Sequence, residues 1–196
     1  MMNKKIIDYE GWELVFFDKS KNFRNYQLNL IKNYLDGHIA EVGPGNGMNL
    51  KSYIKYPKKI DLYEPTKKLF IGLNKNFKKK KKISIFNQKL TTQPDKYNAI
   101  LYLDVLEHIK KDKEEILKSL KSIKKNGYLI INVPAYSHLY SQFDKDVGHY
   151  KRYIKKDFII LLKDLKIKEL NLIYYDSIGY MLSLISKLTS SNYKKN

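Results

Sequence analysis

A length of 196 residues allows one domain with a sizeable hydrophobic core, and an apolar fraction of 43% excludes a disordered chain. The absence of cysteine excludes disulfides, thiolate metal sites and cysteine nucleophiles. The net charge of +18 rests on lysine, since only Arg24 and Arg152 are arginines. Proteins that grip phosphates favour the bidentate arginine fork, so we do not expect nucleic acid as the partner. A solvated surface explains the lysine run 78–82 better than a functional patch for anionic surfaces does.

Short apolar strands alternate with helices through the first two thirds of the chain. Strands that are continuous apolar runs predict a mostly parallel sheet with helices on both faces, in an α/β fold. No internal repeat or linker interrupts the pattern, so we predict a single domain over 1–196 with its core at 22–165. Helices are predicted over 22–35, 48–56, 66–77 and 112–123, and strands over 38–42, 59–64, 83–86, 99–103 and 128–133.

The pattern changes after Pro134. Residues 134–153 form a long loop rich in tyrosine and histidine, followed by a predicted helix over 155–165 and a predicted strand over 167–175. The apolar stretch 178–188 is expected to pack as a helix, with lining of a substrate pocket or a peripheral membrane contact as alternatives. No apolar run reaches the roughly 18 residues of a membrane span, and the N-terminus lacks a secretory signal. We therefore expect a cytoplasmic protein. The alternative is a protein bound peripherally to the inner face of the membrane.

A glycine-rich turn joins the first predicted strand to the second helix. Gly43, Gly45 and Gly47 lie where the backbone must bend sharply, and their lack of a Cβ lets a ligand approach the main-chain N–H groups. Nicotinamide sites require the spacing G-x-G-x-x-G, whereas this chain has G-x-G-x-G, with the acid Glu41 two residues before the first glycine. The spacing thus argues against a nicotinamide site.

A carboxylate ends the neighbouring predicted strand. Glu64 follows the glycine turn by roughly 20 residues, and an acid at such a strand end can accept hydrogen bonds from both hydroxyls of a ribose. A helix cap or a surface acid is the alternative for Glu64, and a tight turn without a ligand is the alternative for the glycines. Together, the turn and the acid predict a nucleoside site.

Three ordered motifs resemble those of class I S-adenosylmethionine-dependent methyltransferases. They are the segments 41–47, 97–109 and 125–131, and the likeness spans about 22–165. The resemblance implies a Rossmann-like fold and S-adenosyl-L-methionine as the cofactor. It places Glu41 and the glycines at the methionine end, and Glu64 at the ribose. The cofactor-binding residues implied are Glu41, Gly43, Gly45, Gly47, Glu64, Pro65, Asn87, Gln88, Asp104 and Val105, with Asn87 or Gln88 beside the adenine.

The segment 148–153 is similar to a Gly-His-Tyr-Arg-Arg-Tyr-like element of a bacterial subgroup that is often associated with cell-envelope glycans and lipid-type substrates. His149 is a predicted general base, and His108 is the second candidate catalytic residue. Alternatively, His149 and Arg152 fasten the loop to Asp144 or Asp146, and His108 packs at a helix start. We predict no metal site. The predicted substrate-binding residues are Tyr140, Tyr150, Arg152 and Tyr153.

Two departures narrow the function. The Asn/Asp-Pro-Pro-aromatic motif of enzymes that methylate base amines does not follow the fourth strand, and no seventh strand is visible, so the final antiparallel strand is missing or shortened. We therefore expect an enzyme that moves a methyl group to O or N of a small-molecule, glycan or lipid-linked acceptor. An RNA-directed methyltransferase and a cofactor-binding protein without catalysis are the rivals.

Overall fold

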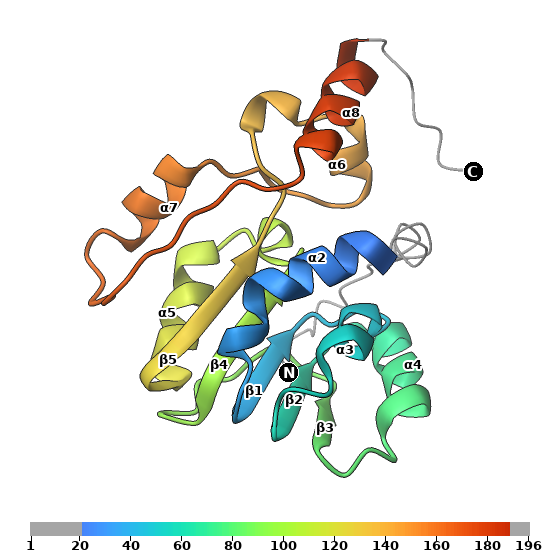
Figure 1. Cartoon of the computed structure of the whole chain (residues 1–196), viewed down its shortest axis with the longest axis vertical. Coiled ribbons are helices and arrows are strands. Elements are labelled where there is room, and N and C mark those ends of the chain that lie inside the picture. Colours follow the sequence, from blue (N-terminus) through green and yellow to red (C-terminus); the bar gives the residue numbers. More distant parts are fainter. Residues whose placement is uncertain (1–20, 189–196) are drawn as a thin grey trace, which may run out of the picture.

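The computed structural model describes residues 21–188, which fold around a five-stranded parallel sheet of order β3-β2-β1-β4-β5 (Figure 1). All four strand pairs are parallel. This confirms the Rossmann-like α/β fold expected from the sequence. The strands are β1 (His38–Val42), β2 (Lys59–Tyr63), β3 (Ile83–Phe86), β4 (Tyr97–Leu103) and β5 (Ile123–Asn132).

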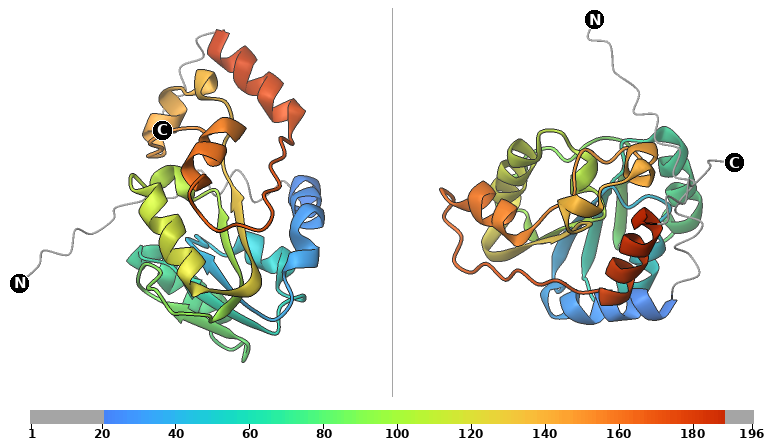
Figure 2. Two further views of the ribbon diagram at one scale, coloured as in Figure 1. Left: turned by 90° about the vertical axis from the view of Figure 1, so that its left-hand side faces the viewer. Right: turned by 90° about the horizontal axis from the view of Figure 1, so that it is seen from above.

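Helices cover both faces of the sheet, and Figure 2 shows α2 and α5 on opposite sides of it. Alternate residues of each strand point to opposite faces: in β4, Leu101 joins the core against α2, α3 and α4, while Ile100 joins the core on the face of α5. The helices are α2 (Lys21–Ile31), α3 (Met48–Tyr53), α4 (Lys67–Phe77), α5 (Asp112–Ser122), α6 (Gln142–Asp146), α7 (Lys155–Leu162) and α8 (Ser177–Leu188).

Strand β5 begins earlier than the sequence indicated. Ile123 already pairs with Tyr97, and the register then shifts so that Tyr128 pairs with Ala99. The intervening residues form a bulge in which Asn126 adopts a positive φ of 61°. The turn at Asn126 and Gly127 therefore lies inside the strand pairing, where the sequence predicted a connection between helix and strand.

The predicted strand over 167–175 is wrong. This segment has no strand assignment, and no backbone hydrogen bond joins 168–175 to β5 among the described residues. It is instead held by side chains: the Tyr175 hydroxyl donates to Asn132 at the end of β5 and accepts a hydrogen bond of 2.8 Å from Gln27 of α2. Tyr175 thus anchors an extended segment that runs across the molecule from α7 to α8 (Figure 1).

The apolar stretch at 178–188 is helical as expected, but the packing expected of it is not observed for four of its large apolar side chains. It forms α8, whose Ile178, Met181, Leu182 and Ile185 are more than half exposed. None of the helices in the described part of the chain is long and apolar enough to cross a membrane.

Candidate active site

The glycine turn follows β1 directly. Gly43, Gly45 and Gly47 have φ values of 65°, 57° and 79°, a conformation that other residues adopt only with strain. The Gly43 N–H donates to the Tyr63 carbonyl at 2.9 Å, which ties the turn to the end of β2. A Cβ on Gly43 would lie 2.8 Å from Cγ2 of Val105, so the turn also packs closely against the residues after β4.

Glu64 supports this turn from the end of β2. Its Oε2 accepts the Gly45 N–H at 3.1 Å, its Oε1 accepts the Thr66 N–H at 2.8 Å, and the side chain is only 3% exposed. Burial raises the pKa of Glu64, while these backbone hydrogen bonds oppose the rise. The Thr66 side chain donates a third hydrogen bond, and a carboxylate offers about four acceptor sites, so about one remains for a ribose hydroxyl. Neither alternative from the sequence is observed, because the N-cap of α4 is Thr66 without a side-chain cap and Glu64 is buried. The ribose role of Glu64 stays a prediction.

Asn87, predicted beside the adenine, joins the ends of β2 and β3. Its Nδ2 donates to the carbonyls of Glu64 at 2.9 Å and Pro65 at 3.2 Å, and its side chain, like that of Gln88, is exposed. These contacts place Asn87 next to Glu64 and Pro65. Their contact with a cofactor stays a prediction.

Glu41 lies deeper than the other predicted cofactor residues. Its carboxylate is buried and accepts a hydrogen bond from the Tyr53 hydroxyl of α3. Burial raises the pKa of Glu41 to about 7, and the charge of Glu64 adds to the effect. Glu41 therefore supports the turn from inside the core. To contact the methionine part of a cofactor, it would have to exchange the hydrogen bond from Tyr53 for one from the cofactor.

Taken as a whole, the turn fits an adenosyl sulfonium cofactor. The N-terminus of α3 and the acid Glu64 border the turn, while Val105 and Phe77 pack where a Cβ on Gly43 or Gly47 would lie.

Asp104 directly follows β4. It has a positive φ of 58°, its N–H donates to the Asn132 carbonyl at 3.0 Å, and its Oδ1 accepts Asn132 Nδ2 at 2.6 Å. Desolvation raises the pKa of Asp104 to about 6, against the opposing effects of His149 and Asn132. The side chain is nonetheless exposed to solvent. Such a carboxylate is available to a ligand at the strand ends.

The loop after β5 folds around one buried acid, Asp144, which is 0% exposed. Its carboxylate accepts both the N–H and the hydroxyl of Ser141, Nδ1 of His149 at 2.9 Å and Nε of Arg152 at 2.8 Å. Burial alone would raise the pKa of Asp144, but the His149 and Arg152 hydrogen bonds lower it to about 2. His149 and Arg152 thus fasten the loop to Asp144, as the alternative reading of the sequence allowed. The anchor is Asp144 and not Asp146.

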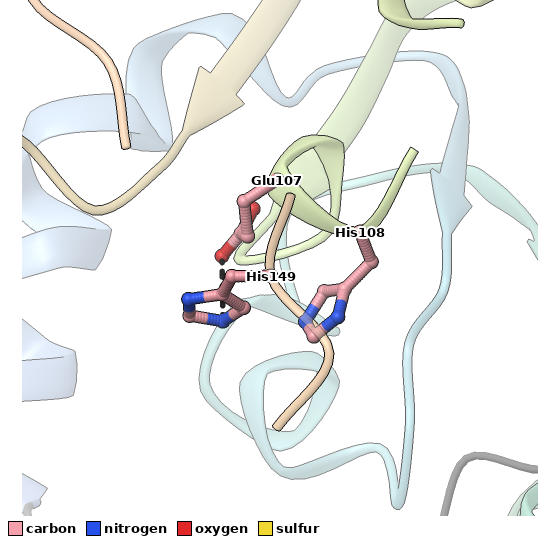
Figure 3. Close-up of side chains that lie close together, drawn as sticks. All are labelled: Glu107, His108 and His149. Carbon is pink, nitrogen blue, oxygen red and sulfur yellow. Dashed lines mark ion pairs between the residues drawn. The ribbon is translucent and has the colours of Figure 1, made fainter. Parts of the chain in front are cut away.

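The anchored loop brings His149 to Glu107 and His108, which lie in the 3-10 turn Leu106–His108 after β4. Figure 3 shows Glu107, His108 and His149 together, with His149 Nε2 3.8 Å from Glu107 Oε1. The rings of His108 and His149 meet edge to face, with centroids 4.7 Å apart. Burial, and then the neighbouring His149, lower the pKa of His108 to about 4, so His108 is neutral at pH 7 and a weak base.

The predicted substrate-binding tyrosines differ in their surroundings. Tyr150 is 59% exposed, while the Tyr140 hydroxyl donates to the His149 carbonyl at 2.7 Å. Tyr153 is buried, and its hydroxyl donates to Asp112 at 3.0 Å. Tyr150 is therefore the tyrosine best placed to touch a ligand, and Tyr153 holds the loop against α5.

The comparisons with known proteins agree with this geometry. Residues 7–169 match the family model of a methyltransferase domain. The chain belongs to this methyltransferase family. The methyl donor of this methyltransferase is S-adenosyl-L-methionine, which a neighbouring solved structure also contains. A comparison with curated protein sequences gave no match.

Solved structures show the same fold at low identity. Phosphoethanolamine N-methyltransferase 2 of Haemonchus contortus, in complex with S-adenosyl-L-methionine, matches with a TM-score of 0.66 at 12% identity, over 85% of this chain and 42% of that one. A Leishmania major methyltransferase matches with 0.60 at 17%, over 78% and 63%. A chain of the complex with the Haloferax volcanii Trm112 methyltransferase activator matches with 0.66 at 9%, over 93% of both chains. At these identities the likeness shows the fold alone.

Two groups of the methyltransferase were missed by sequence reasoning. Asn132 orients Asp104, and Glu107 faces His149 from the other side of the cluster. The only available signal was that Asn132 ends an apolar strand and that Glu107 adjoins His108. Neither signal identifies a partner about 30 to 40 residues away, because that depends on the path of the loop.

Proposed function

We propose that this methyltransferase moves the methyl group to an O or N atom of a small-molecule, glycan or lipid-linked acceptor. The observation that carries the proposal is the anchored loop: the Asp144 network, together with the hydrogen bond of 2.8 Å from the Tyr150 N–H to the Glu107 carbonyl, fastens 134–153 over the end of β4. Acceptors bind outside the carboxyl ends of the strands in such folds. The loop would therefore form the acceptor side of the site.

The cofactor supplies a methyl group on a sulfonium sulfur, and the protein must align the acceptor with it and exclude water. The amides of the glycine turn and Glu64 are the groups proposed to hold the cofactor, with Asp104 and Val105 closing the side nearest the acceptor. His149 and His108 border the end of β4. Their catalytic role is part of the proposal.

The acceptor class is tested by turnover. Formation of S-adenosylhomocysteine is followed with the purified chain and a panel of sugars, lipid-linked sugars, phenols and amines, including phosphoethanolamine because of the Haemonchus contortus neighbour. Turnover on a hydroxyl or amine acceptor of the panel supports the proposal. Cofactor binding without turnover on any acceptor supports a non-catalytic protein, and turnover confined to RNA, with affinity falling steeply with salt, supports the RNA-directed rival.

Glu64 gives a direct test of the cofactor side. We expect Glu64→Ala to weaken S-adenosylmethionine binding by several-fold to a hundredfold, about 1–3 kcal/mol, because polar groups of the ribose lose their acceptor. Calorimetric titration measures the affinity, and Glu114→Ala, at an exposed acid paired with Lys111, is the control. Thermal unfolding without cofactor measures the separate loss of the Gly45 and Thr66 hydrogen bonds. Unchanged affinity in the Glu64 variant would remove Glu64 from the site.

A further inference from the structure

Three potential metal ligands meet at the carboxyl end of β4. One ligand atom from each of Glu107, His108 and His149 lies within 4.8 Å of the other two (Figure 3). Glu107 and His108 are neighbours in the 3-10 turn Leu106–His108, and His149 comes from the loop after β5. The hydrogen bond from Tyr150 N–H to the Glu107 carbonyl fixes the two segments against each other. The cluster is therefore formed by the fold without a ligand.

Glu107 is the observation that points to an occupant. Its side chain is 1% exposed, and its buried Oε2 has no hydrogen-bond partner among the described residues. Its Oε1 lies 3.8 Å from His149 Nε2, which is too long for a hydrogen bond. A buried carboxylate is costly unless it is paired or coordinates a metal. Asp104 and Asp144 add negative charge around Glu107, and the positive charge of Arg152 opposes their effect.

The orientation of His149 matches that of a ligand. Because its Nδ1 lies 2.9 Å from Asp144 Oδ1, and Arg152 holds Asp144 as an anion, Nδ1 carries the hydrogen and donates it. In the neutral form of the ring, Nε2 would then carry the lone pair, on the side of Glu107. A carboxylate behind one ring nitrogen is the arrangement that fixes the tautomer of metal-ligating histidines. A metal ion between the Glu107 carboxylate and the neutral His149 ring would be bound by both groups.

We propose that Glu107, His108 and His149 bind one divalent first-row transition ion, of the zinc type, beside the acceptor site. Two imidazoles and a carboxylate favour such an ion over magnesium or calcium, which prefer all-oxygen sites. Ligands about 2 Å from a tetrahedral zinc lie roughly 3.3 Å apart, so small side-chain rotations close the cluster onto an ion. Three protein ligands leave a coordination position for water or an acceptor oxygen. In this site His149 is a ligand, in place of the general base that the sequence predicted.

Metal binding is tested with the full, untagged chain after removal of metals by a chelator, without donor or acceptor. Zn²⁺ is titrated by calorimetry and Co²⁺ by its visible absorption. We expect one ion per chain, cobalt bands of a four- or five-coordinate site, and no competition from excess Mg²⁺. Absence of a one-to-one site, or displacement by Mg²⁺ at equal concentration, would overturn the proposal.

Variants localise the ion. Glu107→Gln and His108→Ala are each expected to weaken Co²⁺ binding at least tenfold, whereas the exposed controls Glu114→Gln and His138→Ala retain it. Circular dichroism confirms folding, and His108→Ala serves as the test if Glu107→Gln fails to fold. Equal affinity in His108→Ala and His138→Ala would refute the assignment. Because no acceptor is present, a negative result leaves the proposed methyl transfer intact.

Discussion

Asp144→Asn is expected to destabilise the chain by about 3–5 kcal/mol and to abolish turnover. The substitution removes the buried charge that holds the loop 134–153 together. The carboxylate is 0% exposed, and Arg152, only 12% exposed, would keep its charge without a partner. Asparagine has one acceptor oxygen for four donors, and its amide would face the donors of His149 and Arg152. Chemical denaturation measures the free energy of unfolding.

Asp146→Asn is the matched control for this variant. Asp146 lies two residues further on, and its side chain accepts one exposed hydrogen bond, from Gln142 at 2.8 Å. Its replacement is expected to change the free energy of unfolding by no more than about 0.5 kcal/mol. Similar losses in the two variants would show that the Asp144 network does not hold the loop.

The same carboxylate makes stability depend on pH in a defined direction. The pKa of Asp144 falls from 3.8 to about 2 on folding, because the hydrogen bonds from His149 and Arg152 outweigh burial. A lowered pKa stabilises the folded state above about pH 4, and this contribution, about 2 kcal/mol, is lost as the pH falls from 4 to 2. In urea denaturation, the free energy of unfolding should fall less between pH 5 and pH 3 for Asp144→Asn than for the unmodified chain. Identical losses would contradict this assignment of the pKa shift.

The parallel sheet could be predicted because its strands carry a local signal. Strands β1 and β3 have the predicted bounds, since each is a short apolar run between a helix end or loop and a turn. The segment 167–175 carries the same local signal and is no strand. Whether an apolar, tyrosine-rich segment pairs with an edge strand or docks by its side chains depends on distant partners, here Gln27 and Asn132.

The candidate site also has parts with a local sequence signal and parts that depend on distant residues. The glycine turn and Glu64 lie at element junctions, where spacing along the chain determines position in space, and the structure brings them together. The sequence left Asp144 and Asp146 as equal alternatives for the anchor, because both lie within reach of His149. Only the short helix α6, which buries Asp144, separates them. Glu107 and His149 come from different loops, one after β4 and one after β5. No local sequence signal predicts that they lie together.

Gly43→Ala is expected to weaken S-adenosylmethionine binding by a hundredfold or more and to destabilise the chain by about 1–3 kcal/mol. A positive φ costs an alanine about 1–2 kcal/mol, and the new Cβ would lie 2.8 and 3.0 Å from the two methyl carbons of Val105. Val105 is β-branched and has few rotamers with which to yield. The backbone would therefore shift, and with it the turn amides that are proposed to hold the cofactor.

Gly72→Ala and a compensating change at Val105 separate the causes of this loss. Gly72 lies in α4 with nothing within 4 Å of its added Cβ, so alanine there is expected to stabilise the chain by about 0.5–1 kcal/mol and to leave binding unchanged. Val105→Ala in the Gly43→Ala background removes the collision but not the backbone strain, so it should restore part of the stability and part of the affinity. Calorimetric titration and thermal unfolding of the four proteins give both quantities. Full affinity in Gly43→Ala would mean that the cofactor does not use this turn.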